Sequence, residues 1–129
     1  MGTAADLRGI SILLVEDHED FRVALRLALE GAGATVREAG NGFEALASVQ
    51  QAPPDLILCD LKMPRMDGCA FVTRLRELAG FGHIPVIALT GESSENNVVR
   101  TMEAGFHGHL VKPVSPEALR AQIHRVLGR

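Results

Sequence analysis

The sequence predicts an α/β domain in which helices cover both faces of an open, doubly wound parallel β-sheet. Five short β-rich segments alternate with five amphipathic segments along the chain. Three of the β-rich segments are apolar without the alternation of a half-exposed strand, which is typical of parallel strands buried on both faces. The 129 residues, of which 47% are hydrophobic, suffice for one core and one domain. Because crossovers between parallel strands are right-handed, successive helices wind onto the two faces of the sheet.

The strands follow from local composition. ISILLV (residues 10–15), LILC (56–59) and PVIAL (85–89) are the apolar segments and are expected to be central strands. ATVREA (34–39) is more polar, which suits an edge strand, and GHLV (108–111) is a short final strand.

The helices follow from apolar residues spaced three and four positions apart. The expected buried faces of the first three are Phe21, Leu25, Ala28 and Leu29; Phe43, Leu46 and Val49; and Phe71, Leu75 and Leu78. A fourth helix is expected over about residues 94–104. The fifth is expected to begin with Ser115 as N-cap and Pro116 as its first residue. Its expected buried stripe is Leu119, Ile123, Val126 and Leu127.

Composition and charge exclude several classes of protein. The net charge is −3 and the 13 Lys and Arg residues are scattered, which argues against a nucleic-acid binder. Cys59 and Cys69 lack the paired spacing of a zinc site or disulfide framework and are expected to pack in the core. No apolar run is long enough to span a membrane. We therefore expect a protein of the cytoplasm with no membrane partner.

The chain is expected to contain one domain, at residues 10–129. Residues 1–9, MGTAADLRG, lack the apolar region of a signal peptide. We interpret them as a flexible lead-in or the remnant of a linker.

Polar side chains follow four of the expected strands. They are Glu16 and Asp17 after the first strand, Asp60 after the third, Thr90 after the fourth and Lys112 after the fifth. In open α/β sheets, ligands bind beyond the carboxyl ends of the strands. We therefore expect these five side chains to converge at one edge of the sheet.

The acidic residues at this edge predict a cation site. Two carboxylates about 4 Å apart repel by about 4 kcal/mol at an effective dielectric constant near 20, so the cluster requires protonation or a cation. Mg²⁺ prefers oxygen ligands and is typically held by one or two carboxylates together with a phosphate. Asp17 and Asp60 offer such carboxylates, and Lys112 offers a positive charge for a phosphoryl oxygen.

Four segments match a known family in order and spacing. LLVEDHED, PDLILCDLKMPRMDG, PVIALTG and AGFHGHLVKPV resemble the receiver domain of bacterial two-component response regulators, over residues 10–127. The resemblance implies the flavodoxin-like fold with strand order 2-1-3-4-5. It also implies phosphoryl transfer from a histidine kinase or a histidine phosphotransfer protein, followed by a conformational shift at the face of the fourth helix, fifth strand and fifth helix. The only catalysis then expected is the domain's own phosphorylation and slow dephosphorylation.

The resemblance assigns a role to each residue of the acidic edge. Asp60 would be the phosphoacceptor. Asp17 and Asp60 would bind Mg²⁺, or Mn²⁺ in its place, directly, whereas Glu16 would act through a water molecule. Lys62 would add its backbone carbonyl as a further metal ligand. Glu16 differs from the more frequent Asp, and the extra methylene suits a water-mediated contact.

Further roles concern the phosphoryl group and the conformational switch. Thr90 and Lys112 would bind the phosphoryl group, and Thr90 would be coupled to His109 as the switch pair. His109 stands where the family usually has Tyr or Phe, and Val114 stands where Phe is common. These departures leave phosphorylation as expected and make the output harder to predict.

The first helix offers candidate docking residues. Val23 and Leu27 lie four positions apart and off the expected buried stripe, so they should be exposed. An exposed apolar edge beside the acidic site suits docking on the helical bundle that presents the phosphohistidine. The alternative is a wider buried stripe.

Two other functions compete with signalling. An aspartyl-nucleophile phosphatase for small phosphoesters usually has a second Asp two residues after the nucleophile, where this chain has Lys62. A phosphate-independent docking domain would not need the complete set of site residues. The sequence leaves open a free-standing regulator or part of a hybrid histidine kinase, and residues 1–9 favour the hybrid kinase.

Overall fold

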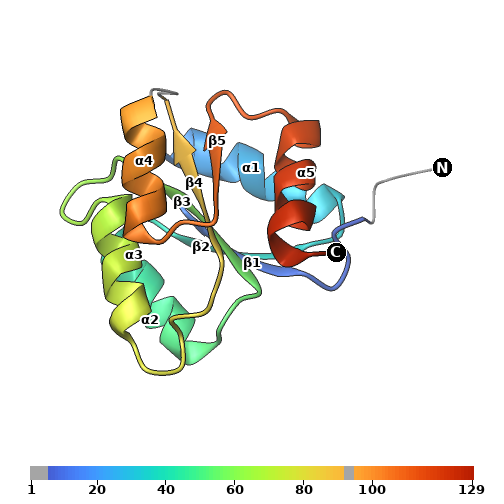
Figure 1. The fold of residues 1–129 in the computed structure, drawn as a ribbon. Helices are drawn as coiled ribbons and strands as arrows, with labels where there is room; N and C mark the ends of the chain where they lie inside the picture. The colour runs from blue at the N-terminus through green and yellow to red at the C-terminus, as the bar shows by residue number, and fades with distance from the viewer. Residues whose placement is uncertain (1–5, 92–94) are drawn as a thin grey trace.

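The computed structural model describes residues 6–91 and 95–129 (Figure 1). The strands are β1 (Ser11–Val15), β2 (Thr35–Ala39), β3 (Leu56–Asp60), β4 (Val86–Thr90) and β5 (Gly108–Val111). They form a parallel sheet in the order β2-β1-β3-β4-β5. The helices are α1 (Glu19–Gly31), α2 (Gly42–Gln51), α3 (Gly68–Glu77), α4 (Glu95–Ala104) and α5 (Pro116–Leu127). The predicted fold class and strand order are confirmed.

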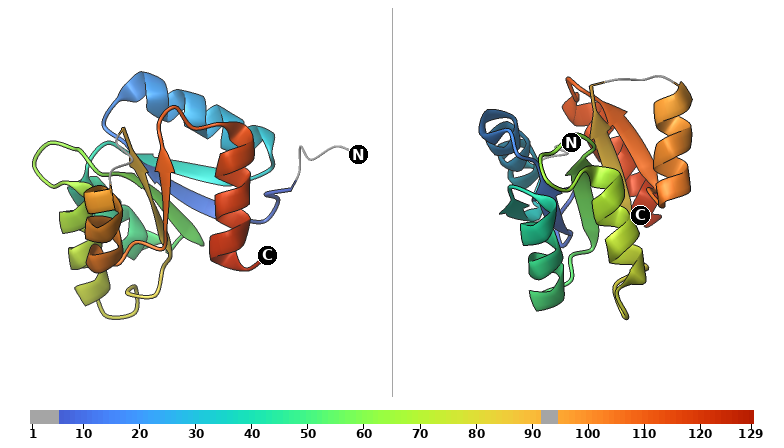
Figure 2. Two further views of the ribbon diagram at one scale, coloured as in Figure 1. Left: turned by 45° about the horizontal axis from the view of Figure 1, so that its top comes forward. Right: turned by 90° about the vertical axis from the view of Figure 1, so that its left-hand side faces the viewer.

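The sheet lies between two layers of helices. Helices α1 and α5 cover one face, and α2, α3 and α4 cover the other (Figures 1 and 2). Alternate residues of β1 contribute to the two cores: Leu13 belongs to the core that contains Phe71 of α3, whereas Leu14 belongs to the core that contains Leu25 of α1. Every residue of β3 and β4 is buried, as expected for central strands, and β2 is the more exposed edge.

Side chains cap the starts of α3 and α5, and the cap of α5 is the one predicted. Ser115 caps α5 by accepting a hydrogen bond from the Ala118 N–H, and Pro116 is its first residue. Asp67 caps α3 by accepting from the Ala70 N–H at 2.8 Å. Within the described ranges, no helix is long and apolar enough to cross a membrane.

The packed structure begins before residue 10. Leu7 is fully buried among the residues that α1 and β1 contribute to the core, and its N–H donates to the Ala32 carbonyl at 2.9 Å. Leu7 therefore belongs to the packed domain, since burying a leucine side chain stabilises the fold by about 2 kcal/mol. The interpretation of residues 1–9 as a flexible lead-in or linker remnant does not hold for this residue. Residues 1–5 of the proposed lead-in lie outside the described residues.

The expected buried faces of the first three helices need three corrections. Ala28 is exposed, because α1 buries the narrower stripe of Leu25 and Leu29. Phe43 is 51% exposed, because α2 packs through its small residues and Phe43 lies about 100° around the helix from Gly42. Leu78 follows the end of α3 and is only partly buried.

Candidate functional site

Three carboxylates meet at the carboxyl ends of β1 and β3. Glu16 and Asp17 follow β1, Asp60 ends β3, and one oxygen of each lies within 4.8 Å of the others. The two strands are neighbours and parallel, with Val15 opposite Cys59, so the residues that follow emerge at the same edge. The expected convergence of the acids is thus observed.

Glu16 is the most enclosed of the three acids. Its side chain is fully buried, and its carboxylate accepts hydrogen bonds from the His18 N–H and from Lys112 Nζ, both at 3.0 Å. Burial raises the pKa of Glu16, although the two hydrogen bonds oppose this shift. The position of Glu16 is therefore fixed from two sides.

Lys112 supplies the positive charge of the site. Its Nζ lies 3.0 Å from Glu16 Oε1, 3.2 Å from Asp60 Oδ2 and 4.4 Å from the centre of the Phe21 ring. Burial alone would lower the pKa of Lys112, but its hydrogen bond to Glu16 and the charge of Asp60 raise the pKa overall. The ammonium group therefore neutralises two carboxylates from different strands.

The loop after β3 packs closely on Asp60. The Lys62 N–H donates to Asp60 Oδ1 at 3.2 Å, and the Gly68 N–H donates to the Leu61 carbonyl at 2.9 Å. A Cβ atom on Gly68 would lie 2.5 Å from the Asp60 carbonyl oxygen. A glycine at this position therefore allows α3 to begin directly against the phosphoacceptor candidate.

Thr90 and His109 lie at different hollows. Buried Thr90 lines a cavity of about 450 Å³ between the β3–α3 loop and α4, together with Lys62 and Arg100. His109 lines a second hollow of about 250 Å³ formed by α4, β5 and α5. Thr101, which is 1% exposed, lines both, and sequence reasoning missed it because a single threonine in a helix carries no motif.

His109 contacts its surroundings mainly through its backbone. Its carbonyl accepts from Gln122 Nε2 at 3.4 Å, whereas its own buried Nε2 atom has no hydrogen-bond partner in the part of the chain that the structure describes. The ring is partly buried, so it is neither a free surface group nor a core residue.

The two candidate docking residues differ in exposure. Leu27 is 58% exposed, as expected. Val23 is partly buried, so the prediction that it is exposed is wrong. It lies one helical turn before Leu27, closer along the helix to the half-buried Phe21.

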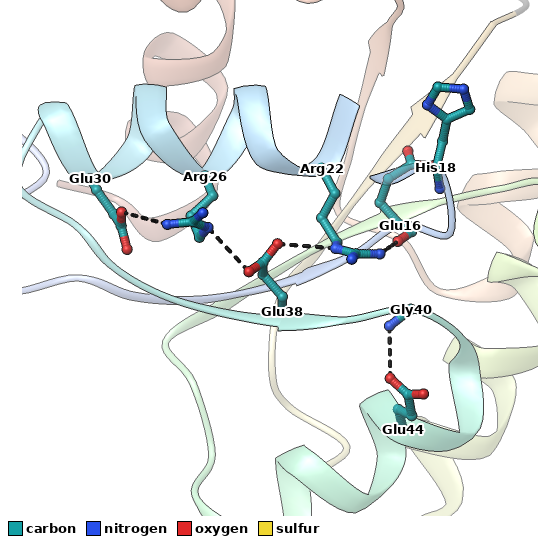
Figure 3. Close-up of polar contacts among 8 residues, drawn as sticks. All are labelled: Glu16, His18, Arg22, Arg26, Glu30, Glu38, Gly40 and Glu44. Carbon is teal, nitrogen blue, oxygen red and sulfur yellow. Dashed lines mark hydrogen bonds and ion pairs between the residues drawn. The ribbon is translucent and has the colours of Figure 1, made fainter. Parts of the chain in front are cut away.

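Arg22 contacts the backbone of the site, although no pattern in the sequence indicated this contact. Its Nη1 donates to the backbone carbonyl of Glu16 at 2.9 Å, and its Nε donates to Glu38 Oε1 at 3.0 Å (Figure 3). An arginine in the first turns of a helix is too common to indicate such a contact from sequence.

The acidic cluster suits a hard divalent cation. Asp17 is exposed and Asp60 is 6% exposed, so one candidate ligand faces solvent and the other lies at the buried end of β3. Ligands of one Mg²⁺ at 2.0–2.1 Å lie at most about 4.2 Å apart, so small side-chain rotations bring oxygens now within 4.8 Å onto one ion. The donor set therefore fits Mg²⁺.

Comparison with known proteins gives consistent matches. Residues 12–124 match the family model described as the response regulator receiver domain. A 14.6 kDa protein of Leptolyngbya boryana is 40% identical over 110 residues, which cover 85% of this chain and 84% of that protein. The transcriptional regulatory protein AfsQ1 of Streptomyces coelicolor is 36% identical over 119 residues, which cover 92% of this chain. The chain spans about half of AfsQ1, at 52%, and 14% of the sensor histidine kinase CheAY of Helicobacter pylori.

Solved structures agree with these sequence matches. Chemotaxis protein CheY4 of Vibrio cholerae is 36% identical with a TM-score of 0.87, and the alignment covers 91% of this chain and 98% of CheY4. The receiver domain of the sensor histidine kinase PA1611 of Pseudomonas aeruginosa is 28% identical with a TM-score of 0.86, covering 94% of this chain and 99% of that one. In that structure a magnesium ion is coordinated in the active-site cleft. From its family match, its strand order and these relatives, we conclude that the chain belongs to the response regulator receiver domain family of two-component signalling.

Proposed function

We propose that the protein is a phosphoaccepting signalling domain in which Asp60 accepts a phosphoryl group from a phosphohistidine in the presence of Mg²⁺. The observation that carries this proposal is the meeting of Glu16, Asp17, Asp60 and Lys112 at one edge of the sheet. The phosphohistidine belongs to a histidine kinase or a histidine phosphotransfer protein.

The metal would be held by the carboxylates of Asp17 and Asp60, by the Lys62 carbonyl and, through a water molecule, by Glu16. When bound, Mg²⁺ draws negative charge from the phosphoryl oxygens. The buried Glu16 carboxylate already accepts hydrogen bonds from His18 and Lys112. These bonds support a contact between Glu16 and the metal through a water molecule.

The transfer step uses the Asp60 carboxylate as nucleophile. An oxygen of Asp60 forms a bond to phosphorus as the bond from phosphorus to the imidazole nitrogen of the donor breaks, and the leaving imidazole keeps the electron pair. Lys112 Nζ, now 3.2 Å from Asp60 Oδ2, is close enough to contact the phosphoryl oxygens. Catalysis of this kind consists of positioning and charge stabilisation.

The conformational response would start at Thr90, whose hydroxyl binds the phosphoryl group. Thr101 lies between the cavity that Thr90 lines and the hollow that His109 lines. This arrangement supports coupling from Thr90 to His109 and hence to the face formed by α4, β5 and α5.

A mass measurement tests the phosphoacceptor. After incubation with acetyl phosphate and Mg²⁺, the intact protein should gain the mass of one phosphoryl group, and Asp60→Asn should gain none. Asp67→Asn is the matched control, because Asn also caps helices and Asp67 caps α3 nearby, so this variant should be labelled normally. Equal labelling of Asp60→Asn, or an unlabelled wild type that binds Mg²⁺, would contradict the proposal.

Docking of the phosphodonor is proposed at Leu27, with a contribution from Val23. Leu27→Asp should slow transfer from the cognate kinase and leave labelling by acetyl phosphate unchanged. Phe43→Asp is the control, since Phe43 is similarly exposed, at 51% against 58%, but belongs to α2. Equal slowing by both variants would remove the assignment of the docking surface to α1.

A further inference from the structure

Arg22 joins the acidic loop to the edge strand of the sheet. Its guanidinium donates from Nη1 to the Glu16 carbonyl at 2.9 Å and from Nε to Glu38 Oε1 of β2 at 3.0 Å (Figure 3). The side chain is 20% exposed, and Glu38 on the edge strand is 31% exposed. One planar group therefore holds a backbone oxygen of the loop and a carboxylate of β2 at the same time.

The loop from Glu16 to His18 is held by Arg22 at both ends. The Arg22 N–H donates to the His18 carbonyl at 3.0 Å, and the Arg22 side chain holds the Glu16 carbonyl. The Glu16 N–H in turn donates to the Ala39 carbonyl at 3.0 Å. The backbone on either side of Asp17 is thus attached to α1 and to the end of β2.

Asp17 depends on this backbone for its position. Its side chain is exposed and makes no hydrogen bond with the residues that the structure describes. Because a peptide unit is planar, fixing the Glu16 carbonyl oxygen also fixes the N–H and the Cα of Asp17, which lie in the same plane. The Arg22 hydrogen bond therefore restricts where the Asp17 carboxylate can lie.

We infer that Arg22 is a positioning residue for metal binding: it holds the Glu16–Asp17 peptide, with Glu38 as its anchor, so that the Asp17 carboxylate lies ready for Mg²⁺. This inference rests on the proposed function, which makes Asp17 a direct metal ligand. Residues that orient metal ligands in this way typically contribute 10–100-fold to metal affinity.

Arg26 provides a matched control one helical turn away. It is also paired with Glu38, with Nε 3.1 Å from Oε2, and with Glu30 at 3.2 Å. Within the described residues it makes no hydrogen bond or ion pair with residues 16–18; its partners are Glu30 and Glu38 (Figure 3). Replacing Arg22 or Arg26 removes the same charge and one partner of Glu38, but only replacement of Arg22 releases the loop.

Charge and position predict opposite effects on metal affinity. Removing a positive charge near a cation site should strengthen Mg²⁺ binding, since like charges repel. Loss of positioning should weaken it. The sign of the change in affinity therefore distinguishes the two roles.

The test is a Mg²⁺ titration by calorimetry, because the chain contains neither Trp nor Tyr to report binding by fluorescence. Arg22→Met should bind Mg²⁺ about tenfold more weakly than wild type, which corresponds to about 1.4 kcal/mol. Arg26→Met should stay within about twofold. Circular dichroism without metal checks that each variant is folded at the titration temperature.

Arg22→Lys separates charge from geometry in the same assay. Lysine keeps the positive charge but has no planar fork to hold two acceptors, so it should also bind Mg²⁺ more weakly. Unchanged or tighter binding by Arg22→Met, or equal weakening by Arg26→Met, overturns the positioning role. A folded wild type that binds no Mg²⁺ overturns the proposed metal site as well, so the two failures are distinguishable.

Discussion

Nζ of Lys112 lies 3.0 Å from Oε1 of Glu16, so a lysine that follows β5 meets a fully buried glutamate 96 positions earlier in the chain. The pair joins the two strands across β3 and β4, which lie between β1 and β5 in the sheet. It also keeps a buried carboxylate paired, since an unpaired buried charge is costly. The longer reach of Glu compared with Asp suits this contact.

Loss of the lysine should affect both stability and labelling. Lys112→Met leaves Glu16 without its charged partner. We expect the unfolding free energy without metal to fall by about 1–3 kcal/mol. This loss is smaller than for a fully buried ion pair, because the Lys112 side chain is 27% exposed. Labelling by acetyl phosphate should slow by at least about tenfold. Lys112→Arg should retain most of the stability and still label more slowly, because its planar group does not reproduce the ammonium geometry. Denaturant unfolding measures the change in stability, and intact-mass kinetics measure the labelling rate. Unchanged labelling of Lys112→Met would contradict the proposed role of Lys112 in binding the phosphoryl group.

Replacement of the proposed metal ligand Asp17 should largely abolish the effect of Mg²⁺ on stability. At a concentration 100 times its Kd, a ligand that binds only the folded state adds about 2.7 kcal/mol to the unfolding free energy. Asp17→Asn should lose most of the corresponding rise in melting temperature. Without metal it should be at least as stable as wild type, because a repulsion within the acidic cluster is removed. Asp20→Asn changes an exposed acid of α1 and should keep the rise in melting temperature caused by Mg²⁺. Equal rises in wild type and Asp17→Asn would exclude Asp17 as a metal ligand.

A methyl group on Gly68 should disturb the proposed phosphoacceptor, Asp60. The added Cβ would lie 2.5 Å from the Asp60 carbonyl oxygen and 3.0 Å from Leu61 Cα, so the backbone must move. We expect Gly68→Ala to lose about 1–3 kcal/mol of stability and to label more slowly. Gly31→Ala is the control, because nothing lies within 4 Å of its Cβ position and alanine is favoured in helices by about 1 kcal/mol. Normal stability and labelling of Gly68→Ala would show that the loop accommodates the methyl group.

His107 should make stability fall in mild acid. His107 is exposed as a whole residue, but desolvation of its ring and the nearby Arg76 lower its pKa. Its Nδ1 accepts from Arg76 Nη2 at 3.2 Å and from the Val86 N–H at 3.4 Å, so this side of the ring faces the protein. Arg125 Nη2, at 3.0 Å from the His107 carbonyl, is a second positive group beside it. Since the unfolded chain binds the proton more readily, this contribution to stability is complete above about pH 6.5 and is lost as the pH falls through the lowered pKa.

Replacing the imidazole by an amide tests this prediction. His107→Asn keeps an acceptor for Arg76 without a titrating ring, so its unfolding free energy should fall less than that of wild type between about pH 7 and about pH 5. His83→Asn changes an exposed histidine elsewhere and should retain the wild-type slope. Parallel pH profiles for wild type and His107→Asn would contradict the assignment.

The sequence by itself determined the fold class, the elements and the acidic edge. Apolar runs without alternation identify the central strands, and the rule that parallel strands end at a common edge places Glu16, Asp17 and Asp60 together. These inferences succeed because they depend on the apolar pattern within each segment and on the parallel direction of the strands. The strand order came from the resemblance to a family, and the structure confirms it.

Only the tertiary structure decided which side chains contact one another. Leu7 enters the core and Phe43 stays exposed, because burial depends on the space between packed helices and strands as well as on the apolar character of a residue. The same holds for Arg22, which contacts Glu16 and Glu38 only because α1 packs beside the end of β2. Hydrogen bonds of this kind join segments that are distant in sequence, and their geometry within a few tenths of an ångström is fixed by packing.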